Sequence, residues 1–189
     1  PDYRWHEAGV VAASDGVEAC NAIDPGLFLD PNDGRLWLVY GSYFGYIRLV
    51  ELDPRTGQRV NPNGQPINLA INCEASVMIF HDGWYYLMTA EGGTNSGHAV
   101  TLARAKNLYG PYELHPDRHV VTSRFRPDSE LQRTGHASIV ETQNGETYMV
   151  YLCGRPLKNR GRCILGRETA IQKVEWAKDE WLYTLDRDG

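Results

Sequence analysis

An internal repeat limits the fold of this chain more than any other feature of its sequence. Three units each contain an apolar run, a turn centred on Asp-Gly or Asn-Gly, and a second run rich in aromatic residues. The units span residues 24–41, 74–90 and 135–154, with the aromatic runs at 36–41, 84–90 and 147–154. A further strand-like segment follows each unit, at residues 46–53, 98–106 and 163–171. Such runs between such turns are typical of antiparallel β-strands joined as hairpins.

A repeat of about 40 to 60 residues built from consecutive antiparallel strands predicts the blades of a β-propeller. The units open with a polar residue beside proline or small residues: Asp24, Glu74 and His136. Because the innermost strands of all blades surround one axial channel, we expect these residues to begin those strands and to gather at one mouth of the channel. Turns and strand beginnings also favour such residues, so the repeat alone leaves a purely structural role open.

Composition supports an all-β domain and excludes some classes of partner. Aromatic residues reach 11%, and 19 Gly and 10 Pro residues supply turns. The net charge of -5 argues against a nucleic-acid partner. No apolar run approaches the roughly 20 residues needed to span a bilayer, which argues against a membrane protein. The sequence begins without a signal-peptide pattern, and its localisation, secreted, periplasmic or cytoplasmic, stays open.

Common metal and nucleotide motifs are missing from the sequence. The four cysteines, Cys20, Cys73, Cys153 and Cys163, form no CxxC pair, which argues against a zinc site and against a disulfide scaffold. The disulfide state of the pair closest in sequence, Cys153 and Cys163, stays open. There is no GxxxxGK loop, no GxGxxG after a strand and no HExxH. We therefore expect chemistry that needs neither a nucleotide nor zinc.

Eight motifs in a fixed order carry a resemblance to a known family. Between Trp5 and Trp181 they read NAIDPG, DGRLWLVYGSY, CEAS, DGWYYLMTAEGG, HAVTLARAKNLYGPYE, TGHASIVET, LCGRP and ILGRETAIQ. With these motifs the chain resembles glycoside hydrolase family 43, which contains β-xylosidases, α-L-arabinofuranosidases and arabinanases on a five-bladed β-propeller. The resemblance implies that residues 1–189 are a partial catalytic propeller domain of about three four-stranded blades.

The resemblance also implies roles for four residues. Glu74 in CEAS matches the general acid, and Asp24 in NAIDP matches the carboxylate that modulates the pKa of the acid and holds substrate. Arg167 in GRET matches an arginine that contacts the sugar, although an ion pair with Glu168 is an alternative. His136 in GHAS matches an axial histidine that faces a buried cation or its waters. A structural Ca²⁺ in the channel, reached from His136 through water, is the only metal expected.

Hydrolysis of a glycosidic bond explains why carboxylic acids are needed. The leaving oxygen must be protonated as the bond breaks, and a nearby negative charge raises the pKa of the acid that supplies the proton. An inverting enzyme also needs a general base, at roughly 6.5–9.5 Å from the acid, to activate water. In the family this base lies in an upstream DP motif. Asp2 and Asp15 are the only aspartates before Asp24, and neither matches that motif.

These considerations give a predicted function with one alternative. We expect the base to lie outside this chain, and the three blades to pack against a complementary propeller segment or another copy of the chain. The predicted function is release of terminal xylose or arabinose from xylo- or arabino-oligosaccharides by inverting hydrolysis. The alternative is a non-catalytic, sugar-binding propeller fragment.

Several other side chains receive a secondary or structural interpretation. Phe44, with its neighbours Tyr43 and Tyr46, is expected to stack on a sugar, and core packing is the alternative. Glu91 in AEGG is a secondary site candidate, and its preferred interpretation is a loop residue. Three histidines are expected to be solvated in turns or polar stretches: His81, His115 and His119.

Overall fold

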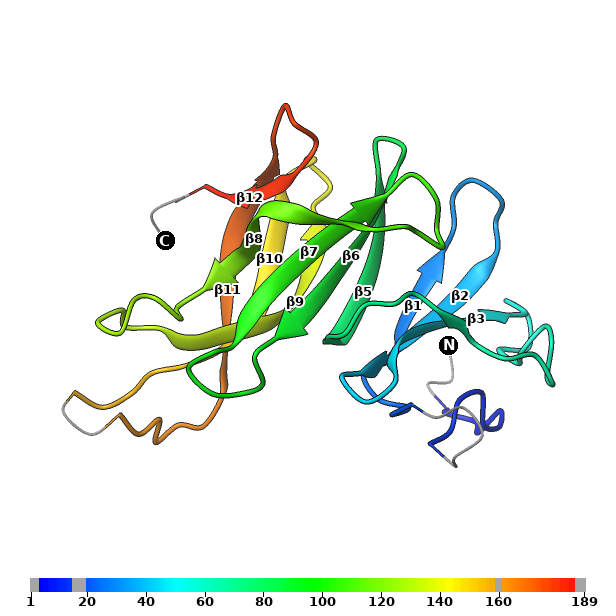
Figure 1. Ribbon diagram of the computed structural model, residues 1–189, viewed down its shortest axis with the longest axis horizontal. Helices are drawn as coiled ribbons and strands as arrows, with labels where there is room; N and C mark the ends of the chain where they lie inside the picture. Colours follow the sequence, from blue (N-terminus) through cyan, green and yellow to red (C-terminus); the bar gives the residue numbers. More distant parts are fainter. Residues whose placement is uncertain (1–3, 15–19, 159–160, 186–189) are drawn as a thin grey trace.

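The computed structural model describes residues 4–14, 20–158 and 161–185, which form three four-stranded antiparallel sheets (Figure 1). Within these ranges there is no helix, and accordingly none long and apolar enough to cross a membrane. Asp2 and Asp15, which the search for a general base considered, lie outside the described residues.

Each sheet takes its strands in sequence order, as expected for propeller blades. The first sheet contains β1 (Gly26–Leu29), β2 (Leu36–Ser42), β3 (Tyr46–Leu52) and β4 (Ile67–Asn68). The second contains β5 (Glu74–His81), β6 (Trp84–Glu91), β7 (Ala99–Ala105) and β8 (Glu113–Thr122). The third contains β9 (Gln132–Glu141), β10 (Thr147–Gly154), β11 (Glu168–Trp176) and β12 (Leu182–Thr184).

The predicted strands are confirmed with one exception. The three aromatic-rich runs are β2, β6 and β10, and the segments at 46–53 and 98–106 are β3 and β7. The strand predicted at 163–171 is placed too early, because β11 begins at Glu168. A turn occupies the residues before it: Gly166 has a φ of +74° and donates its N–H to the carbonyl of Cys163 at 3.1 Å. This left-handed conformation suits glycine and interrupts the extended chain.

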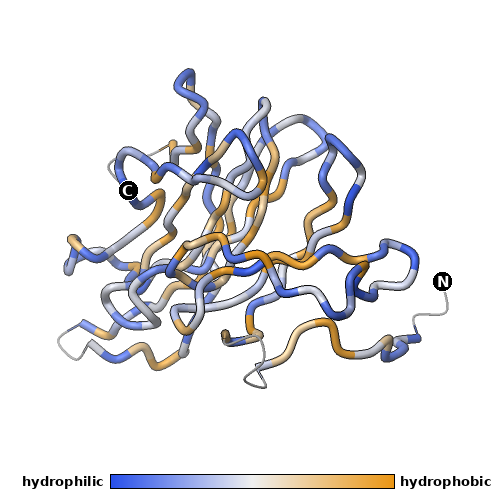
Figure 2. Tube along the Cα trace, turned by 45° about the vertical axis from the view of Figure 1, so that its right-hand side comes forward, coloured by the Kyte–Doolittle hydropathy of each residue, from blue (hydrophilic) through white to orange (hydrophobic). Residues whose placement is uncertain are grey.

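Two apolar layers lie between the three sheets. In Figure 2 the hydrophobic stretches of the tube follow the strands, and the connecting loops are mostly hydrophilic. The layer between the first and second sheets includes Phe28, Val39, Ile47, Leu49, Met78 and Leu87. The layer between the second and third sheets includes Met88, Val100, Leu102, Met149, Tyr151 and Val174. Burial of these side chains at roughly 1.5–3 kcal/mol each is the main force that holds the sheets together.

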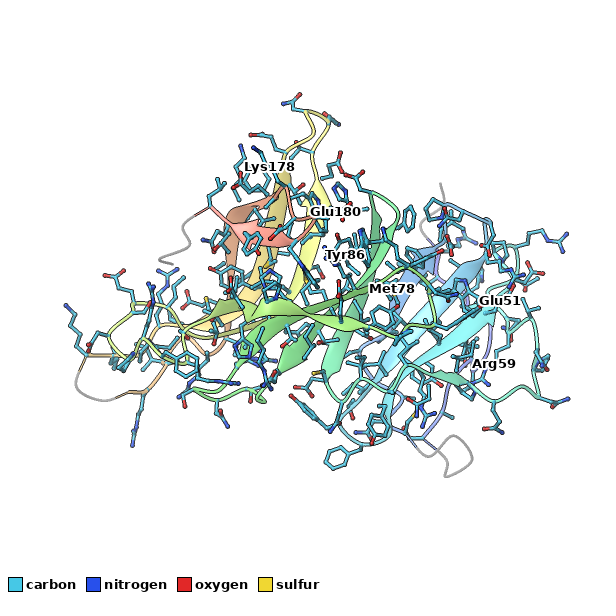
Figure 3. The ribbon with its side chains drawn as sticks, turned by 45° about the horizontal axis from the view of Figure 1, so that its top comes forward. Glu51, Arg59, Met78, Tyr86, Lys178 and Glu180 are labelled. Atoms are coloured by element: carbon cyan, nitrogen blue, oxygen red, sulfur yellow. The ribbon has the colours of Figure 1, made fainter. Side chains whose placement is uncertain are left out.

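The second and third sheets are also joined by polar contacts near the turn at residues 177–181. The Tyr86 hydroxyl donates to the backbone carbonyl of Glu180, and the Trp84 indole N–H donates to the Glu180 carboxylate at 2.8 Å (Figure 3). Arg104 lies over the rings of Trp84 and Trp181, 4.2 and 4.1 Å from their centroids. These contacts fix the third sheet against the second.

The outer faces of the first and third sheets differ in how far they are covered. Residues 11–12 and Cys20 pack on the outer face of the first sheet, against Tyr40 and Val50. On the third sheet, Val140 and Ile171 are 54% and 66% exposed and flank the half-buried strand β10. The chain therefore presents an apolar surface on its third sheet.

Candidate active site

Residues with a left-handed backbone stand at matching places near the start of the three sheets. The angle φ is 53° at Asp24, 54° at Ala75 and 51° at His136. The pairing of β5 and of β9 shifts by one residue at these places, as at a β-bulge. The left-handed conformation costs a non-glycine residue about 1–2 kcal/mol. Such strain gathers at functional sites, where a bulge can re-aim a side chain.

The register shows which residues of the repeat are equivalent. Glu74 pairs with Ala90, and Gly135 pairs with Leu152. In each strand the regular pairing resumes three residues later. Glu74 therefore corresponds to Gly135, while Ala75 corresponds to His136. Treating Asp24, Glu74 and His136 as equivalent openers was thus wrong by one residue, because an inserted bulge residue is not visible in the repeat.

Only one of these residues begins a strand. Glu74 is the first residue of β5, as predicted. Asp24 lies two residues before β1, and His136 lies inside β9, which begins at Gln132. All three nevertheless lie on the first strand of a sheet or on the segment leading into it, and β5 contacts both β1 and β9.

A hydrogen bond between two sheets places Asp24 beside Glu74. The Asp24 Oδ2 atom accepts the backbone N–H of Ala75 at 3.1 Å. Because Ala75 follows Glu74 directly, the Asp24 carboxylate lies at the backbone of the predicted general acid. Both residues of this contact between neighbouring blades have the left-handed conformation.

Tyr43 makes a second polar contact between the first sheet and the second. Its hydroxyl oxygen accepts the backbone N–H of Gly92 at 2.8 Å, so the phenol reaches from the β2–β3 turn to the end of β6. Burial raises the pKa of the Tyr43 phenol above its usual value, and this outweighs the hydrogen bond from Gly92. The negative charges of Glu74 and Glu91 act in the same direction as burial, which places both carboxylates within electrostatic range of the phenol.

Glu91 is the centre of an ion cluster and not a loop residue, which corrects the sequence interpretation. It is the last residue of β6. Its carboxylate lies 3.0 Å from Arg118 Nη2, 3.5 Å from Arg124 Nη2 and 3.4 Å from His119 Nε2. Burial alone would raise the pKa of Glu91, but the hydrogen bond and charge of Arg118, with the charges of His119 and Arg124, bring it below the usual value. A carboxylate held in this way stays ionised.

The predictions for His115 and His119 are wrong, and His81 is also partly covered. The His119 side chain is only 8% exposed and faces Glu91. His115 is buried against the rings of Trp181 and Tyr183. His81 is half-buried, with its ring stacked on another aromatic side chain. Their polar sequence neighbours gave no sign of this, since the covering groups come from distant segments.

The sequence analysis missed His98, a buried side chain at the centre of this region. A Cβ atom on Gly135 would overlap the His98 imidazole, so the ring packs directly on the residue before His136. Burial lowers the pKa of His98, and the positive charges of His136 and Arg167 lower it further. His98 therefore lies close to both predicted sugar-contacting residues. The only sequence signal was its position at the start of the strand segment predicted at 98–106.

Arg167 and Phe44 lie at the edges of the site. Arg167 is exposed, directly before β11. Its predicted alternative partner, Glu168, lies 3.5 Å from Arg155 Nε. Phe44 is 74% exposed, and its carbonyl accepts the backbone N–H of Asn21 at 3.0 Å, close in sequence to Asp24. These side chains are free to contact a ligand.

Two separate contacts thus gather the predicted residues along one end of the sheets. One is the hydrogen bond from the backbone N–H of Ala75, next to Glu74, to Asp24, and the other is the packing of His98 on Gly135, next to His136. The end of β6, at Glu91, lies between these two contacts. Tyr43 reaches the residue after Glu91 from the first sheet, and His98 directly precedes β7, the strand that pairs with β6. Two carboxylates, a histidine and an arginine from three sheets can hold and protonate an oxygen of a polar ligand.

No group of three or more His, Cys, Asp or Glu side chains in the described ranges is placed to hold a metal ion. All four cysteines are free thiols. A calcium ion takes six to eight oxygen ligands, so the His136 imidazole by itself makes no calcium site.

Comparison with known proteins identifies the relatives of this chain. The family described as "Glycosyl hydrolases family 43" matches residues 1–182. A xylosidase/arabinosidase 43B from Humicola insolens is 45% identical over 174 residues, which cover 86% of this chain and 32% of that protein. A xylan 1,3-beta-xylosidase from a Vibrio species is 41% identical over 181 residues, covering 85% and 34%.

A solved structure confirms the fold class. The xylan beta-1,4-xylosidase from Bacillus halodurans C-125 superposes with a TM-score of 0.76 and 46% sequence identity, over 87% of this chain and 33% of that one. The three sheets are blades of a β-propeller, as predicted. This chain spans about a third of the length of the relatives it matches.

Proposed function

The chain belongs to glycosyl hydrolase family 43, and from this membership we propose that it supplies part of the active site of a glycosidase. The proposed reaction releases terminal xylose or arabinose from xylo- or arabino-oligosaccharides with inversion of configuration. Relatives named xylosidase, arabinofuranosidase and arabinanase support this substrate class. Paired carboxylic acids perform such hydrolysis without a cofactor.

The observation that carries the proposal is the contact between Asp24 and the segment of Glu74. In the proposed mechanism Glu74 donates a proton to the leaving glycosidic oxygen, because that oxygen gains negative charge as the bond breaks. In this proposal the Asp24 carboxylate, bound to the N–H of Ala75, places a negative charge beside the segment of Glu74. Asp24 also offers a free oxygen to a sugar hydroxyl.

Other residues are assigned to holding the sugar. Arg167 donates hydrogen bonds to sugar oxygens, and His136, next to the packed pair of Gly135 and His98, holds a hydroxyl from the other side. Exposed Phe44 offers a flat apolar surface at the edge of the site. If a calcium ion is present, His136 faces it through a water molecule. The oxygen ligands of the ion are then water molecules and groups outside the described residues.

The general base is assigned to a carboxylate other than Asp24 and Glu74. Glu91 does not suit this role, because Arg118, Arg124 and His119 already surround its carboxylate. The alternative function, sugar binding without catalysis, follows if no base completes the site.

We also propose that the outer face of the third sheet packs against a complementary propeller segment or another copy of the chain. Exposed Val140 and Ile171 support this proposal, because an apolar sheet face is normally covered. Sedimentation of the chain and of Val140→Lys tests it. If another copy covers the face, the chain should associate and the charged residue should reduce the association. A monomer with either residue would contradict packing against another copy and leave the complementary segment as the proposed occupant.

The catalytic proposal is tested by leaving-group dependence, measured on an enzyme preparation that contains this chain. Glu74→Gln keeps the shape of the side chain but removes its proton. It should therefore slow hydrolysis of xylobiose far more than hydrolysis of an activated aryl β-xyloside, whose leaving group needs little protonation. Asp24→Asn should slow both substrates, because it removes charge and weakens sugar binding together. Equal losses on both substrates for Glu74→Gln would remove Glu74 from the acid role.

The matched control is Glu180→Gln, which changes a carboxylate on the far turn of the third sheet. It should leave both rates unchanged, because the Glu180 carboxylate accepts its hydrogen bond from Trp84, away from the predicted catalytic residues. Saccharide binding by the wild-type preparation without turnover of any substrate would favour the non-catalytic alternative.

A further inference from the structure

A groove of about 680 Å³ lies between the second and third sheets, beside the candidate active site, with His119 in its wall. Its walls come from the end of β8, the connection at residues 123–131, and strands β9 to β11, which approach one another in Figure 1. Small-molecule sites in proteins measure about 300–1,000 Å³, so the groove has the size of a ligand site. None of the predicted catalytic and sugar-contacting residues lines it.

Two buried hydroxyl groups in the groove wall lack a partner. Ser123 and Thr134 are 5% and 4% exposed, and among the described residues neither Ser123 Oγ nor Thr134 Oγ1 finds a hydrogen bond. A buried hydroxyl without a partner is unfavourable, so native proteins normally satisfy it. Both residues line the groove, and since neither oxygen is exposed to it, a rotation of the side chain about χ1 must accompany any hydrogen bond to a ligand there.

An amide side chain offers further polar contacts in the same wall. The Tyr151 hydroxyl donates to Gln172 Oε1 at 3.4 Å, which is long for a bond between oxygen atoms. The Gln172 amide nitrogen donates no hydrogen bond to a described residue, so it is available to a ligand oxygen. Amide and hydroxyl groups that both donate and accept suit a ligand rich in hydroxyl groups.

The rim of the groove adds an aromatic surface without a net charge. Phe125 is 76% exposed, although its ring would bury a large apolar area if covered. Arg126 and Glu130, also at the rim, carry opposite charges. A flat apolar ring beside neutral hydrogen-bonding groups matches a sugar ring, which has apolar C–H faces and hydroxyl edges.

We propose that this groove is a second saccharide site, which holds a short neutral oligosaccharide beside the candidate active site. The choice of a xylo-oligosaccharide as ligand rests on the proposed function. Thr134 is two residues from His136 along β9, so an oligosaccharide retained in the groove is kept near the catalytic residues without occupying their site.

The test is a titration of the ¹⁵N-labelled 189-residue chain with xylotriose, followed by amide chemical shifts. Saturable shifts are expected at Ser123, Thr134 and the Gln172 side-chain amide. Phe125→Ala and Gln172→Ala should each weaken this binding about tenfold, the factor that corresponds to about 1.4 kcal/mol. Phe125→Tyr should keep it, because the ring remains.

The controls separate this groove from the candidate active site. Tyr109→Ala removes another exposed aromatic ring outside the groove and should not change the groove shifts. Shifts only at Glu74 and His136 would overturn the second site and leave the proposed function standing. Shifts only in the groove would support the second site and count against sugar binding at the active site. No shift at either place, or binding unchanged in Phe125→Ala, would overturn the inference.

Discussion

Substitution of Gly135 by alanine tests whether His98 positions the segment that carries His136. Gly135 does not have a positive φ, so alanine is compatible with its backbone, and the whole effect must come from its added methyl group. That methyl group would overlap the His98 imidazole, which is 1% exposed and therefore enclosed by other atoms. Overpacking of this kind costs about 1–3 kcal/mol of the free energy of unfolding.

A double-mutant cycle isolates this contact. His98→Ala removes the ring and is itself destabilising, by about 2–4 kcal/mol for a large buried side chain. In that background the methyl group of Gly135→Ala enters the space left by the ring and should cost less than about 0.5 kcal/mol. The two substitutions should therefore be strongly non-additive. Urea unfolding at constant m-value measures all four proteins.

The control for this cycle is Ser138→Ala, an exposed residue three positions further along β9. It should change stability by no more than about 0.5 kcal/mol and show no coupling to His98→Ala. Gly135→Ala should also weaken saccharide binding, since backbone that moves away from His98 carries His136 with it. Additive costs for Gly135→Ala and His98→Ala would refute the argument that the ring and the backbone of β9 are in direct contact.

Three further predictions concern the ion cluster, the core and the repeat turns. Glu91→Gln should destabilise the chain by about 1–3 kcal/mol at neutral pH. Because the pKa of Glu91 in the folded chain lies below its usual 4.5, the stability advantage of the wild type is fully present above pH 4.5 and should shrink as the pH falls through the folded pKa. Urea unfolding at several pH values measures this loss. Met149→Ala, at a fully buried position between the second and third sheets, should cost about 2–5 kcal/mol, whereas Val140→Ala on the exposed face should cost less than about 1 kcal/mol; equal melting temperatures for the two would contradict the assignment of faces. Gly145→Ala should cost about 1 kcal/mol in thermal unfolding although nothing lies within 4 Å of the new methyl group, because φ is +75° there.

The sequence predicted the strands well because their signals are local. A β-hairpin is fixed by its turn and by the apolar residues on either side of it, and both are readable within about twenty residues. The segment at 163–171 shows the limit of such reading. Its residues Cys163 to Leu165 are apolar like a strand, but the left-handed Gly166 ends that run and delays β11 to Glu168.

The site was less readable, because its contacts join segments that are far apart in the sequence. Glu91 has the sequence neighbours of a loop residue, yet Arg118 and His119 from β8 and Arg124 from the connection after it surround its carboxylate. His98 gave no signal beyond its position, since its burial depends on Gly135 in the next blade. Motif resemblance named Glu74 and Asp24, but the bond between Asp24 and Ala75 required the structure.

The bulges explain why the polar site residues lie at the start of each repeat unit but not at equivalent positions within it. An inserted left-handed residue turns the side chains around it relative to those of the regular strand, so each blade can present a different polar group at its first strand without changing the apolar alternation that packs the sheets. In the first and third blades the left-handed residue itself, Asp24 or His136, carries the polar group. In the second blade that position is Ala75, whose N–H binds Asp24, and the residue before it, Glu74, carries the acid. The strain is thus placed where neighbouring blades meet, and a contact between blades repays part of it.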